Sequence, residues 1–326
     1  MSPKVKWGIL STASIGTEQV IPAMIKGKYC DVRAIASRSK DSAEKAAERF
    51  AIPRAYGSYE ELLMDPEIDA VYIPLPNHLH VPWSILALEA GKHVLVEKPV
   101  ALSSEEARRL LDEALKYPEL KVMEAFMYRH HPQWLKAKEL VESGVIGSLK
   151  TIQSSFSFFE DDPESIVNKK EFGGGSLMDI GCYPISLSRF LFNAEPTEVH
   201  AKIEVHPQFK TDTMATVILE FEHGTSAFFS STLMPDMQQT EVFGTKGRIL
   251  FDLPFNPVAD QPARIWLCLG DRKEEIIFDS CDQYTIQGDL FSLAILHDTP
   301  VPTPLQDSVD NMIVIERIME KIENEK

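Results

Sequence analysis

Short apolar segments alternate with segments of helical periodicity through the first third of this 326-residue chain. The apolar segments predict strands at Val5–Leu10, Val32–Ser37, Ala70–Ile73 and Val94–Val96. Strands that alternate with helices pair as a parallel sheet that carries helices on both faces. This order therefore predicts a doubly wound α/β domain. It also predicts where a ligand would bind, because the carboxyl ends of parallel strands share one edge of the sheet.

After a further predicted strand at Lys121–Ala125, the pattern changes from about Met127 to strands with few helices between them. The strand candidates of this part are Thr151–Phe158, Glu198–Val205, Ala215–Phe221, Thr225–Thr232, Glu241–Phe251, Arg264–Leu269 and Glu275–Phe278. Strands joined by short turns pair antiparallel. The expected fold class is α/β, with a Rossmann-type doubly wound parallel sheet over residues 1–124. Residues 125–326 are expected to form an α+β domain with a large, mainly antiparallel open sheet.

The composition disfavours several classes of partner. The chain has 33 Lys and Arg against 49 Asp and Glu, a formal net charge of −16, which disfavours nucleic acid and anionic membranes. No apolar run approaches the roughly 18 residues that span a bilayer. Met1 leads almost directly into a strand, so we expect no signal peptide. The four cysteines lack metal-binding spacing, so we expect reduced thiols in a cytoplasmic protein and no metal site.

A loop of small residues follows the first predicted strand. It reads S-T-A-S-I-G, in the place of the dinucleotide fingerprint G-x-G-x-x-G, with two glycines replaced. The fingerprint needs small residues so that backbone amides can approach a pyrophosphate at a helix N-terminus. An ordinary strand-to-helix turn is the alternative interpretation. The candidate cofactor-binding residues of this loop are Ser11, Thr12, Ala13, Ser14 and Ile15.

Ser37 and Arg38 stand at the end of the second predicted strand. A site specific for NAD usually has Asp or Glu there, where the carboxylate binds the ribose 2′-hydroxyl. A carboxylate would repel a 2′-phosphate, whereas Arg38 and the neighbouring hydroxyls would bind one. We therefore predict NADP as the cofactor, with NAD as the alternative. The plainer interpretation of Arg38 is a solvated loop charge.

Two further loops follow predicted strands at the same edge. The loop after Ala70–Ile73 adds four candidate cofactor-binding residues, Leu75, Pro76, Asn77 and His80. Of these, Asn77 and His80 are expected to face the nicotinamide ribose, and an N-cap role for Asn77 is compatible with that. The loop after Val94–Val96 adds Glu97 and Lys98, and the proline that follows partly sets the direction of the lysine. Lys98 is thus placed to contact a ligand, and an exposed loop lysine is the alternative.

In the second part of the chain, three glycines at Gly173–Gly175 precede an apolar segment of helical character. Glycines let a backbone approach a ligand closely. Asp179 and Tyr183 follow at a spacing of four, which puts them on one face of a helix. A carboxylate and a phenol exposed together suit proton transfer, whereas a tyrosine packed in the core is the alternative. The polar segment Y-R-H-H-P offers Arg129 and His130 as substrate contacts.

Taken together, these stretches resemble the Gfo/Idh/MocA family of NAD(P)-dependent oxidoreductases over essentially the whole chain. The motifs that carry the resemblance are W-G-I-L-S-T-A at Trp7–Ala13, P-N-H-L-H at Pro76–His80, E-K-P at Glu97–Pro99, A-F-M-Y-R-H-H-P at Ala125–Pro132 and G-G-G-S-L-M-D-I-G-C-Y-P at Gly173–Pro184. Within the family, the chain most resembles the branch of dimeric dihydrodiol dehydrogenases, NADP-dependent D-xylose dehydrogenases and glucose–fructose oxidoreductase.

The resemblance implies roles for several residues. In that branch the acid/base is a tyrosine, which Tyr183 matches, while the inositol dehydrogenase branch has histidine there. Lys98 matches the family's catalytic lysine, and Asp179 matches a substrate-contacting aspartate. Ser11 and Ala13 depart from the family's commoner glycines, though not from this branch.

The function implied is reversible hydride transfer between NADP(H) and a CH–OH/C=O group of a sugar-like or cyclic diol substrate, with Tyr183 as acid/base assisted by Lys98. Arg129 is a candidate for contact with both cofactor and substrate. Three alternatives are an NAD-dependent glycosidase, a non-catalytic NADP sensor, and an enzyme that keeps its cofactor bound between two substrates. Residues 125–326 are expected to bind substrate. The apolar side chains of Ala215–Phe221 and Thr225–Thr232 predict a homodimer or homotetramer through the C-terminal sheet.

Overall fold

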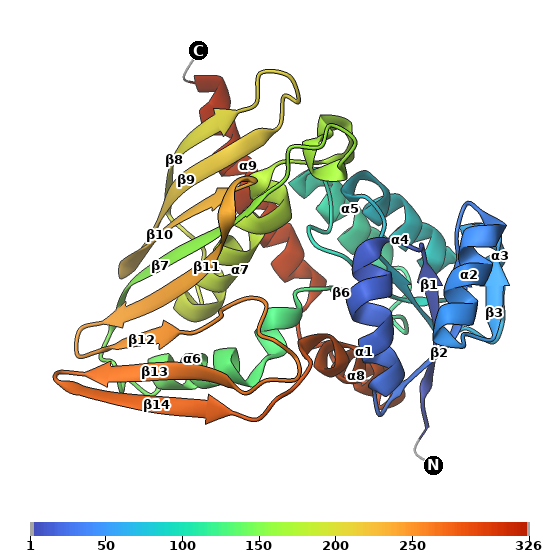
Figure 1. Ribbon diagram of the computed structural model, residues 1–326, viewed down its shortest axis with the longest axis horizontal. Helices are drawn as coiled ribbons and strands as arrows, with labels where there is room; N and C mark the ends of the chain where they lie inside the picture. Colours follow the sequence, from blue (N-terminus) through green and yellow to red (C-terminus); the bar gives the residue numbers. More distant parts are fainter. Residues whose placement is uncertain (1–2, 325–326) are drawn as a thin grey trace. The chain divides into compact units, whose positions relative to one another are not determined.

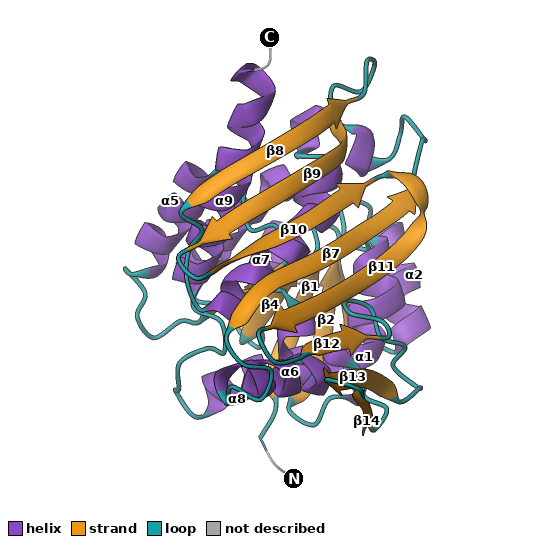
Figure 2. Cartoon of the chain, turned by 90° about the vertical axis from the view of Figure 1, so that its left-hand side faces the viewer, coloured by secondary structure: helices purple, strands orange, loops and turns teal. Residues whose placement is uncertain are grey.

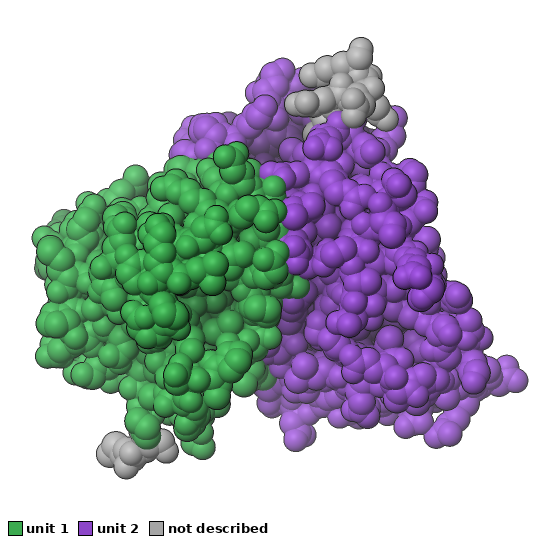
Figure 3. Space-filling view, turned by 180° about the vertical axis from the view of Figure 1, so that it is seen from behind, with its two compact units in different colours: residues 1–127, 282–309 green, residues 128–281, 310–326 purple. Residues whose placement is uncertain are grey.

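The computed structural model describes residues 3–324, and the chain divides into two compact units, coloured separately in Figure 3. Unit 1 runs from the amino terminus to Met127 and also contains Asp282–Val309. Unit 2 contains Tyr128–Cys281 and the segment from Asp310 onward. The division expected from the sequence, at residue 124 with two continuous domains, differs from this one, because a later segment returns to unit 1.

Unit 1 is built on a six-stranded sheet in the order β3-β2-β1-β4-β5-β6, with parallel pairing throughout. Figure 1 labels β1, β2, β3 and β6 of this sheet. The strands are β1 Val5–Leu10, β2 Cys30–Ala36, β3 Arg54–Tyr56, β4 Ala70–Ile73, β5 His93–Val96 and β6 Val122–Glu124. All four residues of β4 are buried, as expected for a strand covered on both faces. The predicted Rossmann-type sheet is confirmed.

The helices of unit 1 begin where the sequence supplies a capping hydroxyl. Ser39, Ser58 and Ser103 each accept a hydrogen bond from a backbone N–H three residues later, which satisfies one of the unpaired donors at a helix start. The helices are α1 Ile21–Lys26, α2 Lys40–Phe50, α3 Tyr59–Leu63, α4 His80–Glu89, α5 Ser104–Ala114 and α8 Gln283–Leu296, and a π-helical turn at Gly16–Val20 precedes α1.

Helix α8 explains why residues 282–309 belong to unit 1. Its Phe291 ring lies 5.6 Å from the ring of Trp7 in β1, and Ser292 Oγ accepts a 3.1 Å hydrogen bond from the Trp7 indole. Asp289 accepts hydrogen bonds from the N–H groups of Lys28 and Tyr29, just before β2. The helix therefore closes the core of the parallel sheet.

Helix α8 was not predicted from the sequence, because its buried face is largely polar or small. The buried residues are Gln283, Gln287, Gly288, Phe291, Ser292 and Ala294. An amphipathic helix is recognised by an apolar stripe at helical spacing, and this helix does not carry one.

Unit 2 is built on an eight-stranded sheet in the order β14-β13-β12-β11-β7-β10-β9-β8. The strands are β7 Leu149–Phe159, β8 Glu198–Val205, β9 Asp212–Phe221, β10 Gly224–Ser231, β11 Leu233–Gly244, β12 Arg248–Phe251, β13 Ala263–Leu269 and β14 Arg272–Phe278. Only the central β7–β10 pair is parallel, so the prediction of a mainly antiparallel sheet is confirmed.

The single strand predicted at Glu241–Phe251 is wrong. This segment contains the end of β11 and all of β12, which pair with each other as a hairpin. The turn is closed by a 2.8 Å hydrogen bond from the Gly244 N–H to the Gly247 carbonyl. The sequence signal is weak because apolar side chains continue on both sides of the turn.

The two faces of the eight-stranded sheet differ. Alternate side chains, such as Ile152, Val217 and Phe228, are buried on the face that carries α7 (Cys182–Phe192), in keeping with the two-residue period of a strand. On the other face, viewed in Figure 2, Thr216 and Ile218 are exposed. The remaining helices are α6 Pro132–Glu142, which contacts β13, and α9 Leu305–Asn324. Helices therefore cover one face of the sheet, and the other face is open.

Candidate active site

Four loops of unit 1 lie at the carboxyl edge of the parallel sheet and contain most of the predicted cofactor residues. Strand β1 leads into Ser11–Ile15, β2 into Ser37 and Arg38, β4 into Leu75–Asn77, and β5 into Glu97 and Lys98. The strand order reverses at β1, which has β2 on one side and β4 on the other. Open α/β sheets bind ligands at such a switch point.

Ser11 adopts a backbone conformation that favours glycine. Its φ is 143°, a value that L residues rarely adopt, at a cost of order 1–3 kcal/mol. The Ser11 hydroxyl accepts a 2.9 Å hydrogen bond from the Ala13 N–H, which offsets part of this cost. The loop therefore keeps a backbone path for which the fingerprint normally uses glycine, and a helical segment begins at Ser14.

The end of β2 presents hydroxyls and a guanidinium. Ser37 is buried, Arg38 is exposed, and Ser39 caps α2. Burial raises the pKa of Tyr59 in α3, while the Arg38 guanidinium and the Ser11 hydroxyl lower it. The Tyr59 phenol therefore lies beside two predicted cofactor residues. Tyr59 was not predicted as a site residue, because no local motif marks it and α3 meets these loops only in the folded chain.

His80 was predicted to face the cofactor, but its ring lies inside the protein. His80 is fully buried, with Nδ1 2.7 Å from the Pro99 carbonyl and Nε2 2.6 Å from the Leu75 carbonyl. Burial lowers the pKa of His80 to about 4, against the opposing effect of the two carbonyls. A neutral imidazole donates through only one nitrogen, so one of these contacts is a hydrogen bond and the other is a close approach, and both nitrogens face main-chain oxygens inside the protein. His80 joins the loops after β4 and β5 and does not present its ring to a ligand.

Glu97 and Lys98 lie at the end of β5. The buried Glu97 carboxylate accepts a 2.6 Å hydrogen bond from the Tyr72 hydroxyl and a 3.3 Å bond from the Lys98 N–H. Lys98 is half-buried, and its peptide bond to Pro99 is cis. Burial raises the pKa of Tyr284 in α8, Glu97 raises it further, and Lys98 lowers it. A phenol of α8, which sequence analysis did not single out, therefore lies near this pair.

In unit 2, Tyr183 lies at the start of α7 within a cluster of aromatic rings. Its ring centroid is 5.4 Å from that of Phe255, 5.6 Å from Phe156 and 5.7 Å from Tyr128. The side chain is only 5% exposed. The Tyr128 hydroxyl donates a 2.9 Å hydrogen bond to Ser186 Oγ in α7. The ring of Tyr183 is therefore held by packing, which limits the directions in which its hydroxyl can point.

Asp179 precedes Tyr183 in a different helical geometry. It lies in a π-helical turn, Leu177–Gly181, that continues directly into α7. The four residues from Asp179 to Tyr183 therefore run from a π turn into an α-helix, and the shared face of the two side chains stays a prediction. Such turns are frequent at functional sites, and Asp179 is half-buried here.

The glycines before this segment are explained by contacts inside unit 2. A Cβ at Gly174 would overlap the main-chain oxygens of Val167 and Ile166, and a Cβ at Gly175 would overlap Asp212 Oδ1. Gly175 also has a φ of 119°. The sequence suggested that these glycines allow a ligand to approach, but at these two positions they allow the protein's own backbone and a buried carboxylate to approach.

Arg129 and His130 lie in a short 3₁₀ turn, Met127–His130. The Arg129 guanidinium donates a 3.1 Å hydrogen bond to the Ser186 carbonyl and lies 5.3 Å from the centre of the Phe190 ring. Burial lowers the pKa of His130 to about 4, and the charge of Arg129 acts in the same direction. His130 Nε2 is buried and has no hydrogen-bond partner among the described residues. It is therefore a neutral imidazole at pH 7 with unused hydrogen-bonding capacity.

The two halves of the predicted site lie in different units. Unit 1 contains the cofactor residues and Lys98, and unit 2 contains Tyr183, Asp179, Arg129 and His130. Within residues 3–324, no group of three or more His, Cys, Asp and Glu side chains could hold a metal, and no helix is long and apolar enough to cross a membrane. No cysteine of this part of the chain forms a disulfide.

A doubly wound parallel sheet, followed in the chain by a unit with an open and mainly antiparallel sheet, is typical of the class of dinucleotide-dependent oxidoreductases. Comparison with known families agrees with this class. Residues 5–126 match the oxidoreductase family with an NAD-binding Rossmann fold, and residues 134–250 match the GFO/IDH/MocA C-terminal domain. The chain belongs to the Gfo/Idh/MocA family of oxidoreductases.

Three relatives illustrate the similarity. The chain is 37% identical over 322 residues to D-xylose 1-dehydrogenase (NADP(+)) 2 of Haloferax volcanii, covering 97% of each chain. It is 37% identical over 248 residues to trans-1,2-dihydrobenzene-1,2-diol dehydrogenase of Xenopus laevis, covering 75% of this chain and 74% of the relative. The structure of a 3-ketoreductase from Actinomadura kijaniata superposes with a TM-score of 0.87 at 29% identity, covering 97% of each chain.

Proposed function

We propose that this protein transfers hydride reversibly between NADP(H) and a CH–OH or C=O group of a sugar-like or cyclic diol substrate. The observation that carries the proposal is the edge of the parallel sheet, where four loops that suit a dinucleotide surround the β1–β4 switch point. The relatives support it, since they act on D-xylose, on a dihydrodiol or on a keto group, and the Actinomadura ketoreductase was crystallised with NADP.

The residues at this edge fit NADP. The Ser11 loop offers small side chains and a glycine-like backbone before a helical start, which suits a pyrophosphate. Arg38, with Ser37 and Ser39 beside it, offers a cation and hydroxyls for a 2′-phosphate. The Asp or Glu that selects the free 2′-hydroxyl of NAD is absent from the end of β2. The cofactor, when bound, supplies the hydride chemistry.

The protein's own contribution to the reaction is proton transfer and orientation. We assign proton transfer to Tyr183, whose phenolate would take the proton of the substrate alcohol during oxidation and whose phenol would return it during reduction. A phenol ordinarily ionises near pH 10, so it needs help at neutral pH. An ammonium nearby favours the phenolate, and we assign this role to Lys98. The tight aromatic packing of Tyr183 would hold its hydroxyl in one direction.

The substrate contacts are assigned to polar side chains of unit 2. His130 carries a buried ring nitrogen without a partner among the described residues, and such groups usually have one. A substrate hydroxyl would supply it. Asp179, half-buried in the π turn, would accept a second hydroxyl. Arg129 already donates to a main-chain oxygen of α7, so we assign it mainly to holding this wall of the site.

The test is substitution of the two catalytic candidates. Tyr183→Phe and Lys98→Met should each lower kcat by about 10²–10⁴-fold, the usual contribution of general acid–base catalysis, with NADP binding nearly unchanged. Tyr128→Phe is the matched control, because it removes a hydroxyl from the same ring cluster. The assay follows reduced cofactor with pentoses, hexoses, anhydrosugars and dihydrodiols. Wild-type turnover in Tyr183→Phe or Lys98→Met would remove that residue from the mechanism.

The same screen, with a nitrophenyl glycoside added, tests two of the three alternative functions. A glycosidase would release the aglycone of a nitrophenyl glycoside with no net reduction of cofactor. A non-catalytic sensor would bind NADP yet give no turnover with any polyol or keto-sugar in either direction.

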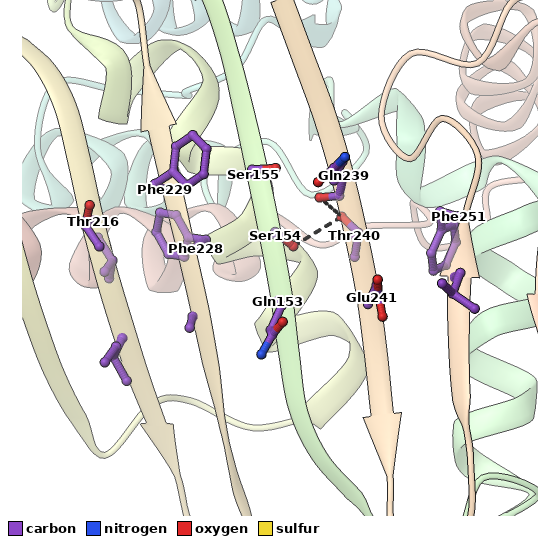
Figure 4. A pocket seen from close by; sticks show the side chains of 14 residues that line it. Gln153, Ser154, Ser155, Thr216, Phe228, Phe229, Gln239, Thr240, Glu241 and Phe251 are labelled. Atoms are coloured by element: carbon purple, nitrogen blue, oxygen red, sulfur yellow. Dashed lines mark hydrogen bonds between the residues drawn. The ribbon is translucent and has the colours of Figure 1, made fainter. Parts of the chain in front are cut away.

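We also propose that a second copy of this chain covers the open face of the eight-stranded sheet. A hollow of about 620 Å³ lies on this face across β9, β10, β7, β11 and β12, where Phe229 and Gln153 are among the lining residues (Figure 4). Ile218, also in the hollow, is 44% exposed. Exposed apolar side chains within a polar surround favour association.

Sedimentation velocity at micromolar concentration tests this assembly. The wild type should sediment as a dimer or tetramer, and Phe229→Asp should shift it toward the monomer. Ile277→Asp, at an exposed position of β14 outside the hollow, should leave the assembly intact. A monomeric wild type would refute the proposed interface.

A further inference from the structure

A buried carboxylate lies against the start of the helical segment that carries Asp179 and Tyr183. Asp212, the first residue of β9, is 3% exposed. Its Oδ2 accepts a 2.7 Å hydrogen bond from the Leu177 N–H, the first backbone donor of the π turn, and a 2.8 Å bond from the Ser176 hydroxyl. Charge-assisted bonds of this length are among the stronger ones in proteins.

A second strand adds to this contact. Ser230 of β10 is fully buried, and its Oγ lies 3.1 Å from Ser176 Oγ. Since the single Ser176 hydroxyl proton goes to the carboxylate, the Ser230 hydroxyl is the donor between the two serines. The hydrogen bonds therefore run from Ser230 to Ser176 to Asp212, and they tie two neighbouring strands to the helix start.

Two glycines allow this arrangement. A Cβ at Gly175 would overlap Asp212 Oδ1, and the φ of 119° at Gly175 disfavours any other residue. A Cβ at Gly181 would lie 3.0 Å from Ser230 Oγ and 2.9 Å from a methyl carbon of Leu177. Gly175 therefore needs to be glycine for the helical segment to lie this close to β9, and a side chain at Gly181 would require Leu177 and Ser230 to shift.

The buried carboxylate is costly for the fold. Burial raises the pKa of Asp212, while the hydrogen bonds from Ser176 and Leu177 oppose this change. Its Oδ1 has no hydrogen-bond partner among the described residues. An asparagine or serine could cap a helix with less desolvation. The Asp212 carboxyl nevertheless accepts two hydrogen bonds at the helix start, and these bonds fix where the helical segment begins.

We propose that Asp212, with Ser230 acting through Ser176, is a positioning residue that fixes the direction of the Tyr183 hydroxyl. Neither side chain needs to touch substrate or cofactor. The two residues act by setting where the segment 177–192 begins, and Tyr183 lies only six residues after the anchored Leu177 N–H. This inference rests on the proposed role of Tyr183 as the acid/base.

The experiment compares Asp212→Asn and Ser230→Ala with the matched control Ser226→Ala. Ser226 is in the same strand, is fully buried, and its Oγ lies 2.7 Å from Ser188 Oγ further along α7. Ser226→Ala thus removes one β10-to-α7 serine contact away from Tyr183, whereas Ser230→Ala removes the contact at the helix start. If Asp212→Asn does not fold, Ser230→Ala carries the test.

The first measurement is the phenolate absorbance of Tyr183, taken as the ultraviolet titration difference between each protein and the same protein with Tyr183→Phe. It needs no substrate. The midpoint should shift in Asp212→Asn and in Ser230→Ala and stay at the wild-type value in Ser226→Ala. The second measurement is turnover with NADP+ and D-xylose, or the best substrate of the screen. We expect kcat to fall by about 10- to 100-fold in Asp212→Asn, the range for a displacement near 1 Å, with KM little changed.

Two failures can be told apart. If Tyr183→Phe keeps wild-type turnover, the proposed acid/base role of Tyr183 fails, and the titration still reports whether Asp212 positions the phenol. If Tyr183→Phe is inactive but Asp212→Asn and Ser230→Ala match Ser226→Ala in both midpoint and kcat, the positioning role is overturned. A loss of thermal stability equal in all three variants, with no other change, would likewise assign these residues to stability alone.

Discussion

Lowering the pH from 7 to 5 should destabilise the protein through His80. The folded-state pKa of about 4 lies below the value of about 6.5 expected in the unfolded chain. The unfolded chain therefore binds the proton first as the pH falls. This contribution to stability is fully present above pH 6.5 and is lost as the pH falls toward 4. Between pH 7 and pH 5 the loss from this one residue is about 2 kcal/mol, and by pH 4 it approaches about 3 kcal/mol.

The assay is urea unfolding at pH 7 and at pH 5, with the two free energies of unfolding compared in each variant. In His80→Gln the difference between the two pH values should shrink by about 2 kcal/mol. The absolute stability should also fall, because the contacts to Leu75 and Pro99 are lost. His223→Gln, whose side chain is 79% exposed, is the control and should keep the wild-type difference. An unchanged difference in His80→Gln would refute the assignment of a neutral, buried ring.

Two other changes probe the cofactor edge and the core of unit 1. Arg38→Ala should raise the Kd for NADP+ by about 10- to 100-fold, because a hydrogen bond to a charged group contributes about 1.5–3 kcal/mol. The Kd for NAD+ should stay nearly unchanged. Equal effects on both cofactors in fluorescence titration would contradict the 2′-phosphate role. Phe291→Ala should lower the free energy of unfolding by about 3–5 kcal/mol, the usual result for a fully buried Phe; a loss below 1 kcal/mol in urea unfolding would show that α8 is not part of the core.

Local patterns were sufficient to predict most of the strands. The period of two in β7 and the uniformly apolar β4 reflect which side chains face the core, and this information is carried by the residues themselves. Prediction failed where the turn or the buried face lacked such a pattern, as in the β11–β12 hairpin and in α8.

In the candidate site, too, some features of single residues could be predicted from the sequence and others could not. That Ser11, Arg38 and Lys98 follow parallel strands could be inferred from the chain order, and the chain order also predicts that they meet at one edge. Which atoms they contact could not be inferred. Tyr59 reaches Arg38 from α3, and Tyr284 reaches Glu97 from a helix almost 190 positions later in the chain.

The chain order and the side-chain pattern are enough to specify a doubly wound sheet, an open antiparallel sheet and the chemistry at the strand ends, because each depends on neighbours within a few residues. Tertiary structure assigned His80 to two carbonyls instead of a ligand, and gave Gly175 a buried carboxylate as its neighbour. Those contacts join parts of the chain that are distant in sequence. Their energies depend on how deeply the groups are buried and on the distances between their atoms, and no local sequence pattern encodes either quantity.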